Sequence, residues 1–199
     1  MANCCFFTLK AAGFGNESDK KAFCDVFEAR KAGNSGENEK PWMRVESYGI
    51  DIEDNGNHVK ISGICDWSVQ TAMLHDGSYA QMKVPGGKFY DESSKMTCLE
   101  ELSRQYGLFM EVYSEESDNG FLEHFVIENG SLKVSECKDY ESYYPEESWE
   151  EFLEVYDGEA PDGVTFEMWQ QAHDEGCDII LGGFEDAYDF KVFSERLAI

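Results

Sequence analysis

Apolar and polar residues alternate along several short stretches of this 199-residue chain, mostly within its first 138 residues. A period of two residues places apolar side chains on one face of a β-strand and polar side chains on the other. This alternation, or a high content of β-forming residues, predicts strands at 4–12, 43–53, 58–65, 108–114, 121–128 and 131–137. The turn sequences Asp54-Asn55-Gly56-Asn57, Ser117-Asp118-Asn119-Gly120 and Asn129-Gly130 lie between neighbouring strands and predict hairpins.

Helical periodicity and capping residues appear between these strands. Ser18 can cap the first helix, which carries apolar residues at helical spacing. Thr97 and Glu100 have the spacing of a capping box, and Gly107 is suited to end the helix that follows. Helices are therefore predicted from 18 to about 32, from 67 to 75 and from 99 to 106, with loops at 33–40 and 77–94.

The predicted order up to about residue 138 is β-α-β-β-α-β-β-β. Its first six elements are those of a split βαβ, ferredoxin-like α+β domain, an antiparallel sheet with helices on one face, here extended by a hairpin. A mostly helical segment follows, with helices predicted at 146–156, 165–175 and 184–198 and a short strand at 178–182. We therefore expect two parts, a domain at 1–138 and an acidic, aromatic-anchored extension packed on it at 139–199.

Charge divides the chain at nearly the same place. Residues 1–138 hold 14 Lys and Arg against 23 Asp and Glu, whereas residues 139–199 hold 2 against 18. From Asp139 to Phe190 there is no lysine or arginine. Charge of this density destabilises a compact state through self-repulsion, and it also repels nucleic acid and anionic membranes. A cationic protein partner is therefore expected, with no direct binding to nucleic acid or membrane.

Residues 146–156 combine an apolar stripe with a row of acids. Trp149, Phe152, Leu153 and Tyr156 fall at i, i+3, i+4 and i+7, the spacing of one helix face. Glutamates occupy most other positions, and none has a lysine four residues later to neutralise it. The predicted partner-binding residues are Glu146, Glu147, Glu150, Glu151, Glu154, Asp157, Glu159 and Asp162. The alternative is that these acids form only a solvated face that resists aggregation.

Cysteines and histidines predict no cofactor or metal site. The seven cysteines are irregularly spaced without a C-x-x-C pair, and the four histidines lack the spacing of zinc ligands. The N-terminal residues have no basic region followed by a long apolar core, and no apolar run approaches the ~18 residues that span a bilayer. We therefore expect a cytoplasmic protein with no cofactor.

Several short motifs carry a resemblance. Met1-Ala2-Asn3-Cys4-Cys5 opens the chain, Asp66-Trp67-Ser68 precedes a predicted helix, and Glu111 to Glu116 lead to Gly120-Phe121. In these motifs the first 138 residues resemble the YubB-type ferredoxin-like family of phage and plasmid proteins, with Cys4 where the family typically has Trp and Val69 where it has Pro. The resemblance implies origin in a mobile element that must survive bacterial defence, and it implies no catalytic residues.

These observations together predict a non-enzymatic inhibitor. Its anionic surface would occupy the basic nucleic-acid groove of a host defence protein, such as a CRISPR effector or restriction enzyme, as a nucleic-acid mimic in the bacterial cytoplasm. Two alternatives stay open. One is a binding module that contacts a protein partner with its sheet face, and the other is a hydrolase that uses a pair of carboxylates.

Overall fold

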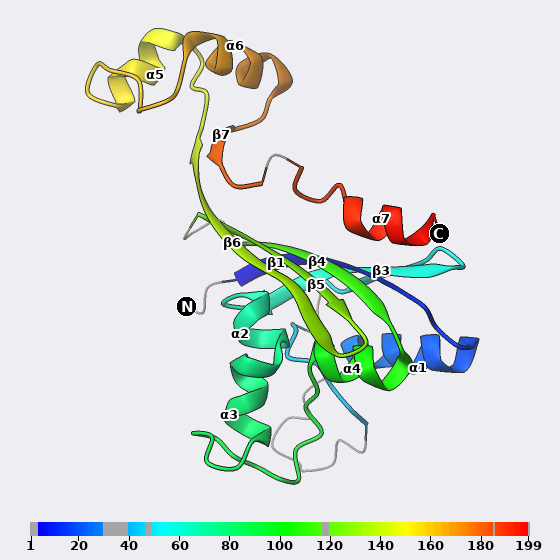
Figure 1. Cartoon of the computed structure of the whole chain (residues 1–199). Helices are drawn as coiled ribbons and strands as arrows, with labels where there is room; N and C mark the ends of the chain where they lie inside the picture. The colour runs from blue at the N-terminus through cyan, green and yellow to red at the C-terminus, as the bar shows by residue number, and fades with distance from the viewer. Residues whose placement is uncertain (1–3, 30–39, 47–48, 117–119, 185, 199) are drawn as a thin grey trace. The chain divides into compact units, whose positions relative to one another are not determined.

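The structure is a computed structural model that describes residues 4–29, 40–46, 49–116, 120–184 and 186–198. Within these residues the chain is an α+β protein with a seven-stranded antiparallel open sheet and seven α-helices (Figure 1). The strands follow the order β2-β3-β1-β4-β5-β6-β7 across the sheet.

The strands are β1 (Cys4–Ala12), β2 (Asp51–Asp54), β3 (His58–Asp66), β4 (Phe109–Glu116), β5 (Phe121–Glu128), β6 (Ser131–Tyr143) and β7 (Ile179–Gly182). The helices are α1 (Glu17–Glu28), α2 (Val69–Met73), α3 (Ala80–Lys83), α4 (Leu99–Tyr106), α5 (Trp149–Val155), α6 (Phe166–Glu175) and α7 (Lys191–Leu197), and a π-helical turn η1 (His75–Tyr79) joins α2 to α3.

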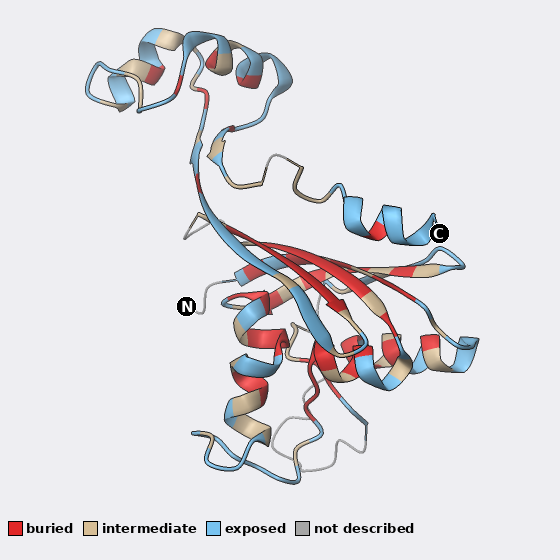
Figure 2. Cartoon of the chain, in the orientation of Figure 1, coloured by how far each residue is buried: buried red, intermediate tan, exposed pale blue. Residues whose placement is uncertain are grey.

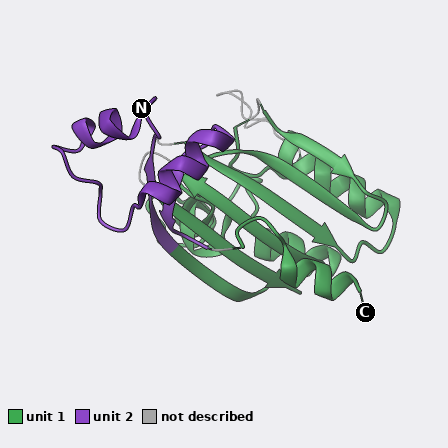
Figure 3. Cartoon of the chain, turned by 90° about the horizontal axis from the view of Figure 1, so that it is seen from above, with its two compact units in different colours: residues 1–137, 186–199 green, residues 138–185 purple. Residues whose placement is uncertain are grey.

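The chain divides into two compact units (Figure 3). Unit 1 comprises Met1–Cys137 together with Asp186–Ile199, and unit 2 comprises Lys138–Glu185. The last fourteen residues, which include α7, therefore group with the first unit, whereas the sequence predicts that they belong to the extension at 139–199.

The core of unit 1 lies between one face of the sheet and helices α1 and α4 (Figures 1 and 2). Strand β1 pairs antiparallel with both β3 and β4, so that Leu9 lies opposite Ile61 on one side and Val112 on the other. All three are fully buried, as is Phe23 of α1. Burial of each large apolar side chain contributes ~1.5–3 kcal/mol, which makes this layer the main source of the unit's stability.

The opposite face of the same sheet is partly covered by α7. Phe190 and Phe193 are buried against Ala12 of β1 and Tyr113 of β4. The Tyr113 ring meets the Phe190 ring edge to face, with 5.2 Å between centroids. This second, smaller apolar cluster explains why the C-terminal residues belong to unit 1.

Several predicted elements are confirmed. The strand at 4–12 is β1, the strands at 58–65, 121–128 and 178–182 match β3, β5 and β7 to within a residue or two, and the helix at 165–175 is α6. Gly107 ends α4 in the left-handed conformation, with φ of +68°. Asn129 and Gly130 both have positive φ, as a tight hairpin turn requires. The Ser117–Asn119 part of the other predicted turn, and most of the predicted loop at 33–40, lie outside the described residues.

Other elements differ from the prediction for identifiable reasons. The strand predicted at 43–53 is only β2, because Met43 is drawn into the core of unit 1 outside any strand. The loop predicted at 77–94 begins with the rest of η1 and with α3. Asn16, not Ser18, caps α1 by accepting the backbone N–H of Asp19. The first helix ends at Glu28, before the predicted limit near 32, because Ala29 takes an extended conformation.

The starts of three further helices also differ from the prediction. Cys98 precedes α4 without a capping side chain, and Glu100 accepts the backbone N–H of His75 in place of the predicted capping box. The helix predicted at 146–156 begins only at Trp149, because Ser148 caps it. The helix predicted at 184–198 shortens to α7, since Phe190 takes a left-handed conformation immediately before it.

Candidate functional site

Helix α5 presents the predicted apolar stripe to the interior of unit 2. Phe152 is fully buried, and Trp149, Leu153 and Tyr156 are half-buried. The Phe152 ring stacks on Trp149 at 5.3 Å and tilts against Tyr156 at 5.0 Å between centroids. Ser148 begins the helix by accepting the backbone N–H of Glu151 at 3.2 Å. The stripe thus fixes which side of α5 faces solvent.

Helix α6 completes this aromatic cluster. Thr165 caps it by accepting the backbone N–H of Met168, and Trp169 is buried with its ring 5.9 Å from that of Trp149. Strands β6 and β7 close the unit by pairing Tyr143 with Ile179, and Ile179 is buried in the same cluster. A small unit of 48 residues thereby gains a core of its own.

Seven of the eight predicted partner-binding acids are exposed, and Glu146 is half-buried. Three of them lie on α5, where Glu154 follows Glu151 by three residues and Glu150 by four. Such neighbours have Cβ atoms about 5–6 Å apart on one side of a helix. Glu146 and Glu147 precede the helix, and the remaining three occupy the segment from 157 to 162 that follows it. Within the described residues, none of the eight forms an ion pair.

Helix α6 adds acids to the same unit. Glu167, Asp174 and Glu175 are exposed. Gln170 and Gln171 donate their amides to Asp174 and Glu175, each at 3.0 Å. Because an amide is neutral, these hydrogen bonds orient the carboxylates without cancelling their charge. On a helix, the residue four positions from a carboxylate is often a lysine that neutralises it. Here a glutamine takes that place, so the negative charge of α6 remains.

The charge of unit 2 is nearly all of one sign. Residues 138–185 contain 15 Asp and Glu and one lysine, Lys138, giving a formal net charge of −14. Two carboxylates ~6 Å apart in water repel by about 0.7 kcal/mol before screening by salt. Packing of the aromatic cluster must offset the repulsion between many such pairs. The acids therefore lower the stability of unit 2.

Three buried glutamates of unit 1 have structural partners. Glu111 accepts the backbone N–H of Phe193 in α7, and Glu100 accepts that of His75. Glu123 accepts the N–H of Val69 at the start of α2, at 2.8 Å, and the hydroxyl of Ser114 at 2.6 Å. Burial raises the pKa of Glu123, and these hydrogen bonds partly offset the rise. Each carboxylate stabilises a helix or turn start.

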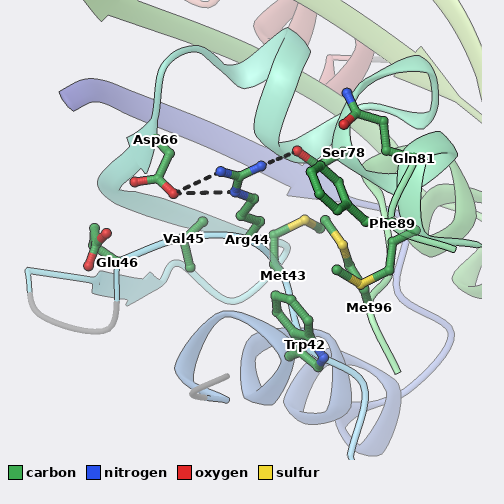
Figure 4. A pocket seen from close by; sticks show the side chains of 11 residues that line it. Trp42, Met43, Arg44, Val45, Glu46, Asp66, Ser78, Gln81, Phe89 and Met96 are labelled. Carbon is green, nitrogen blue, oxygen red and sulfur yellow. Dashed lines mark hydrogen bonds and ion pairs between the residues drawn. The ribbon is translucent and has the colours of Figure 1, made fainter. Parts of the chain in front are cut away.

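A cavity in unit 1 was not foreseen from the sequence. It measures about 540 Å³, and Arg44, Asp66 and Ser78 meet at its edge (Figure 4). These three residues come from separate segments, so no local spacing pointed to them. Met43 and Arg44 open the strand predicted at 43–53, and that alternating pattern gave no sign of a cavity.

Searches for related proteins return no matching family model, no matching curated protein and no matching solved structure. The resemblance to the YubB-type family therefore stays a prediction. Among the described residues, no helix is long and apolar enough to cross a membrane. The same residues contain no group of three or more His, Cys, Asp or Glu side chains placed to hold a metal ion.

Proposed function

We propose that this chain is a non-enzymatic protein of a phage or mobile element that inhibits a host nucleic-acid-binding defence protein. In this proposal it acts in the bacterial cytoplasm, without a cofactor. Unit 2 occupies the partner's basic groove, which would otherwise hold nucleic acid. Glu146, Glu147, Glu150, Glu151, Glu154, Asp157, Glu159 and Asp162 make the contact.

One observation carries the proposal. Almost all of these acids are exposed on a unit with its own aromatic core, and none forms an ion pair within the described residues. Charges placed in this way keep their full attraction for a cationic partner. Such attraction speeds association and makes it sensitive to salt.

The spacing of the charges supports mimicry of a phosphate backbone. Helix α5 carries three glutamates in seven residues, and seven residues extend ~10 Å along a helix axis. This gives about one carboxylate per 3.5 Å, close to the ~3.4 Å that separates successive charges along one DNA strand. A groove built for phosphates would meet a similar charge density on this helix.

The strand pairing of unit 1 supports the ferredoxin-like part of the proposal. β1 lies between β3 and β4, and β2 lies outside β3, with each of these pairs antiparallel. This is the arrangement of a split βαβ motif, in which β1 and β2 run parallel with β3 between them. We propose that β5 and β6 extend that domain, in line with its resemblance to the YubB-type family.

The test compares two variants with the same change in net charge. The first replaces Glu147, Glu150, Glu151 and Glu154 of unit 2 with lysine. The matched control replaces Glu28, Asp51, Glu92 and Glu195 of unit 1, which are also exposed. Each protein is assayed for displacement of a fluorescent duplex from purified CRISPR effectors and restriction enzymes, and for rescue of phage plating on bacteria that carry those systems.

We expect the wild type and the control to displace the duplex and to rescue plating. The unit 2 variant should do neither, and raising the salt concentration should weaken the wild type. Equal inhibition by the two variants would refute the proposal, as would failure of the wild type against every system tested.

Inhibition that does not change with salt would instead favour a binding module that uses its sheet face. Phe6 of β1 supports that second candidate, because its side chain is 54% exposed on the face opposite α1 and α4. A Phe6→Ser variant would then lose inhibition, and the unit 2 variant would retain it. Turnover of a substrate, such as a glycoside, would favour the hydrolase alternative.

A further inference from the structure

The cavity of unit 1 has an apolar interior. Trp42, Met43 and Met96 are buried in its wall, and Met82 and the exposed ring of Phe89 extend it toward solvent. Trp42 and Met96 are held together by a parallel bridge between their backbones. A volume of about 540 Å³ falls in the range that accommodates small organic ligands. Such a wall favours a ligand with an apolar body.

Among the described residues that line the cavity, Arg44 is the only basic one, and its charge is already neutralised. Arg44 donates from Nε and Nη2 to one carboxylate oxygen of Asp66, at 3.3 and 3.1 Å. Its Nη1 donates to the hydroxyl of Ser78, which is buried. Figure 4 shows Arg44 lying between these two partners, beside Phe89 and Met43. Arg44 is therefore better suited to hold the cavity's shape than to attract an anion.

Two acceptors remain available at the polar edge. Both guanidinium hydrogen bonds use Oδ2 of Asp66, and no described residue donates a hydrogen bond to its other oxygen, Oδ1. Glu46 also lines the cavity, and within the described residues its carboxylate forms no ion pair. Arg44, Asp66 and Glu46 together give the lining a net charge of −1, within a chain of net −25. The local and overall charges thus attract a cation.

We propose that this cavity binds a small organic cation with an aromatic or bulky apolar body, such as an arylalkyl ammonium. The ammonium group lies between Glu46 and Oδ1 of Asp66. The apolar body lies against Trp42, Phe89 and the methionines, whose ring faces and polarisable thioethers suit a cationic ligand. This site is independent of the acids of unit 2.

The probe is 4-phenylbutylamine, compared with the matched alcohol 4-phenyl-1-butanol and the matched acid 4-phenylbutyrate. All three share one apolar body and differ in charge. Binding to the full chain is followed by calorimetry and by the indole N–H signals in a ¹⁵N NMR spectrum. We expect the amine to bind at roughly millimolar concentration or below, about tenfold more tightly than the alcohol. The Trp42 signal should shift and the Trp149 signal should not.

Two variants and one control locate the site. Glu46→Gln should weaken amine binding about tenfold, and Asp51→Asn, which removes one charge from an exposed residue outside the cavity, should change it little. Gln81→Trp places a large side chain at the edge of the cavity and should abolish binding, with an unchanged circular dichroism spectrum. Equal loss in the two charge variants, equal affinity for amine and acid, or no shift of Trp42 would overturn the proposal.

Discussion

Glu111 is the residue whose removal tests the packing of unit 1 most directly. Its side chain is fully buried in β4. One carboxylate oxygen accepts the backbone N–H of Phe193 at 2.6 Å, and the other lies 2.9 Å from Nε2 of His124. The contact to Phe193 joins the sheet to α7, so a Glu111→Ala variant should weaken both the global fold and the docking of this helix.

The expected loss in free energy of unfolding depends on the buried partners that Glu111→Ala leaves without an acceptor. A hydrogen bond to a charged group contributes ~1.5–3 kcal/mol, and removing one partner of a buried charged contact costs ~3–5 kcal/mol. We therefore expect Glu111→Ala to lower the free energy of unfolding by about 3–4 kcal/mol, a large part of the ~5–15 kcal/mol of a typical domain. Glu111→Gln keeps the shape and one acceptor, and should cost only about 1–2 kcal/mol.

Urea denaturation monitored by circular dichroism gives the global value, and hydrogen exchange of residues 186–198 reports on α7. The matched control is Glu195→Ala, an exposed position on α7 that should stay within about 0.5 kcal/mol of the wild type. The reasoning would be refuted if Glu111→Ala also stayed within that range and α7 exchanged no faster.

Three further predictions concern other parts of the fold. Because burial raises the pKa of Glu123 above the 4.5 of an unperturbed glutamate, the folded state binds this proton more tightly than the unfolded state. Its contribution to stability should therefore fall as pH rises from about 4.5 through the folded pKa. Urea midpoints of the wild type should decline over that window relative to Glu123→Gln, and a constant difference would contradict this. Ser148→Ala removes the cap of α5 and should cost unit 2 ~1 kcal/mol, measured on thermal unfolding by tryptophan fluorescence, to which Trp149 and Trp169 of unit 2 contribute, with Glu159→Ala, an exposed position of unit 2 outside the helices, as control. Gly107→Ala forces a Cβ into a left-handed position and should cost ~1–2 kcal/mol in urea denaturation, whereas no loss would show that the backbone adapts.

Local chemistry was sufficient to predict much of the fold. The hairpin around Asn55 and Gly56 forms as expected, because Gly56 takes a positive φ in the turn and β2 pairs antiparallel with β3. The apolar stripe of α5 was also predictable, because it depends only on helical spacing within one segment. Because the stripe faces the interior of unit 2, the exposure of most acids on and beside α5 was predictable too.

Features built from distant segments were not predictable in this way. The alternating pattern around Met43 is typical of a strand, yet packing against the core of unit 1 decided its conformation. Glu111 and Glu123 lie in strands where buried neighbours surround them, and only the pairing of β4 with β5 shows why charges are tolerated there. The meeting of Arg44 with Asp66 and Ser78 likewise depends on tertiary structure.

The absence of lysine and arginine between Lys138 and Lys191 has a practical chemical consequence. Trypsin has no site between these two lysines, so residues 139–191 leave a digest as one long acidic peptide. Amine-directed cross-linkers and acetylating enzymes likewise find no primary amine on the side chains from Asp139 to Phe190. Carbodiimide coupling, which activates carboxylates, is the reagent class suited to trapping whatever binds unit 2.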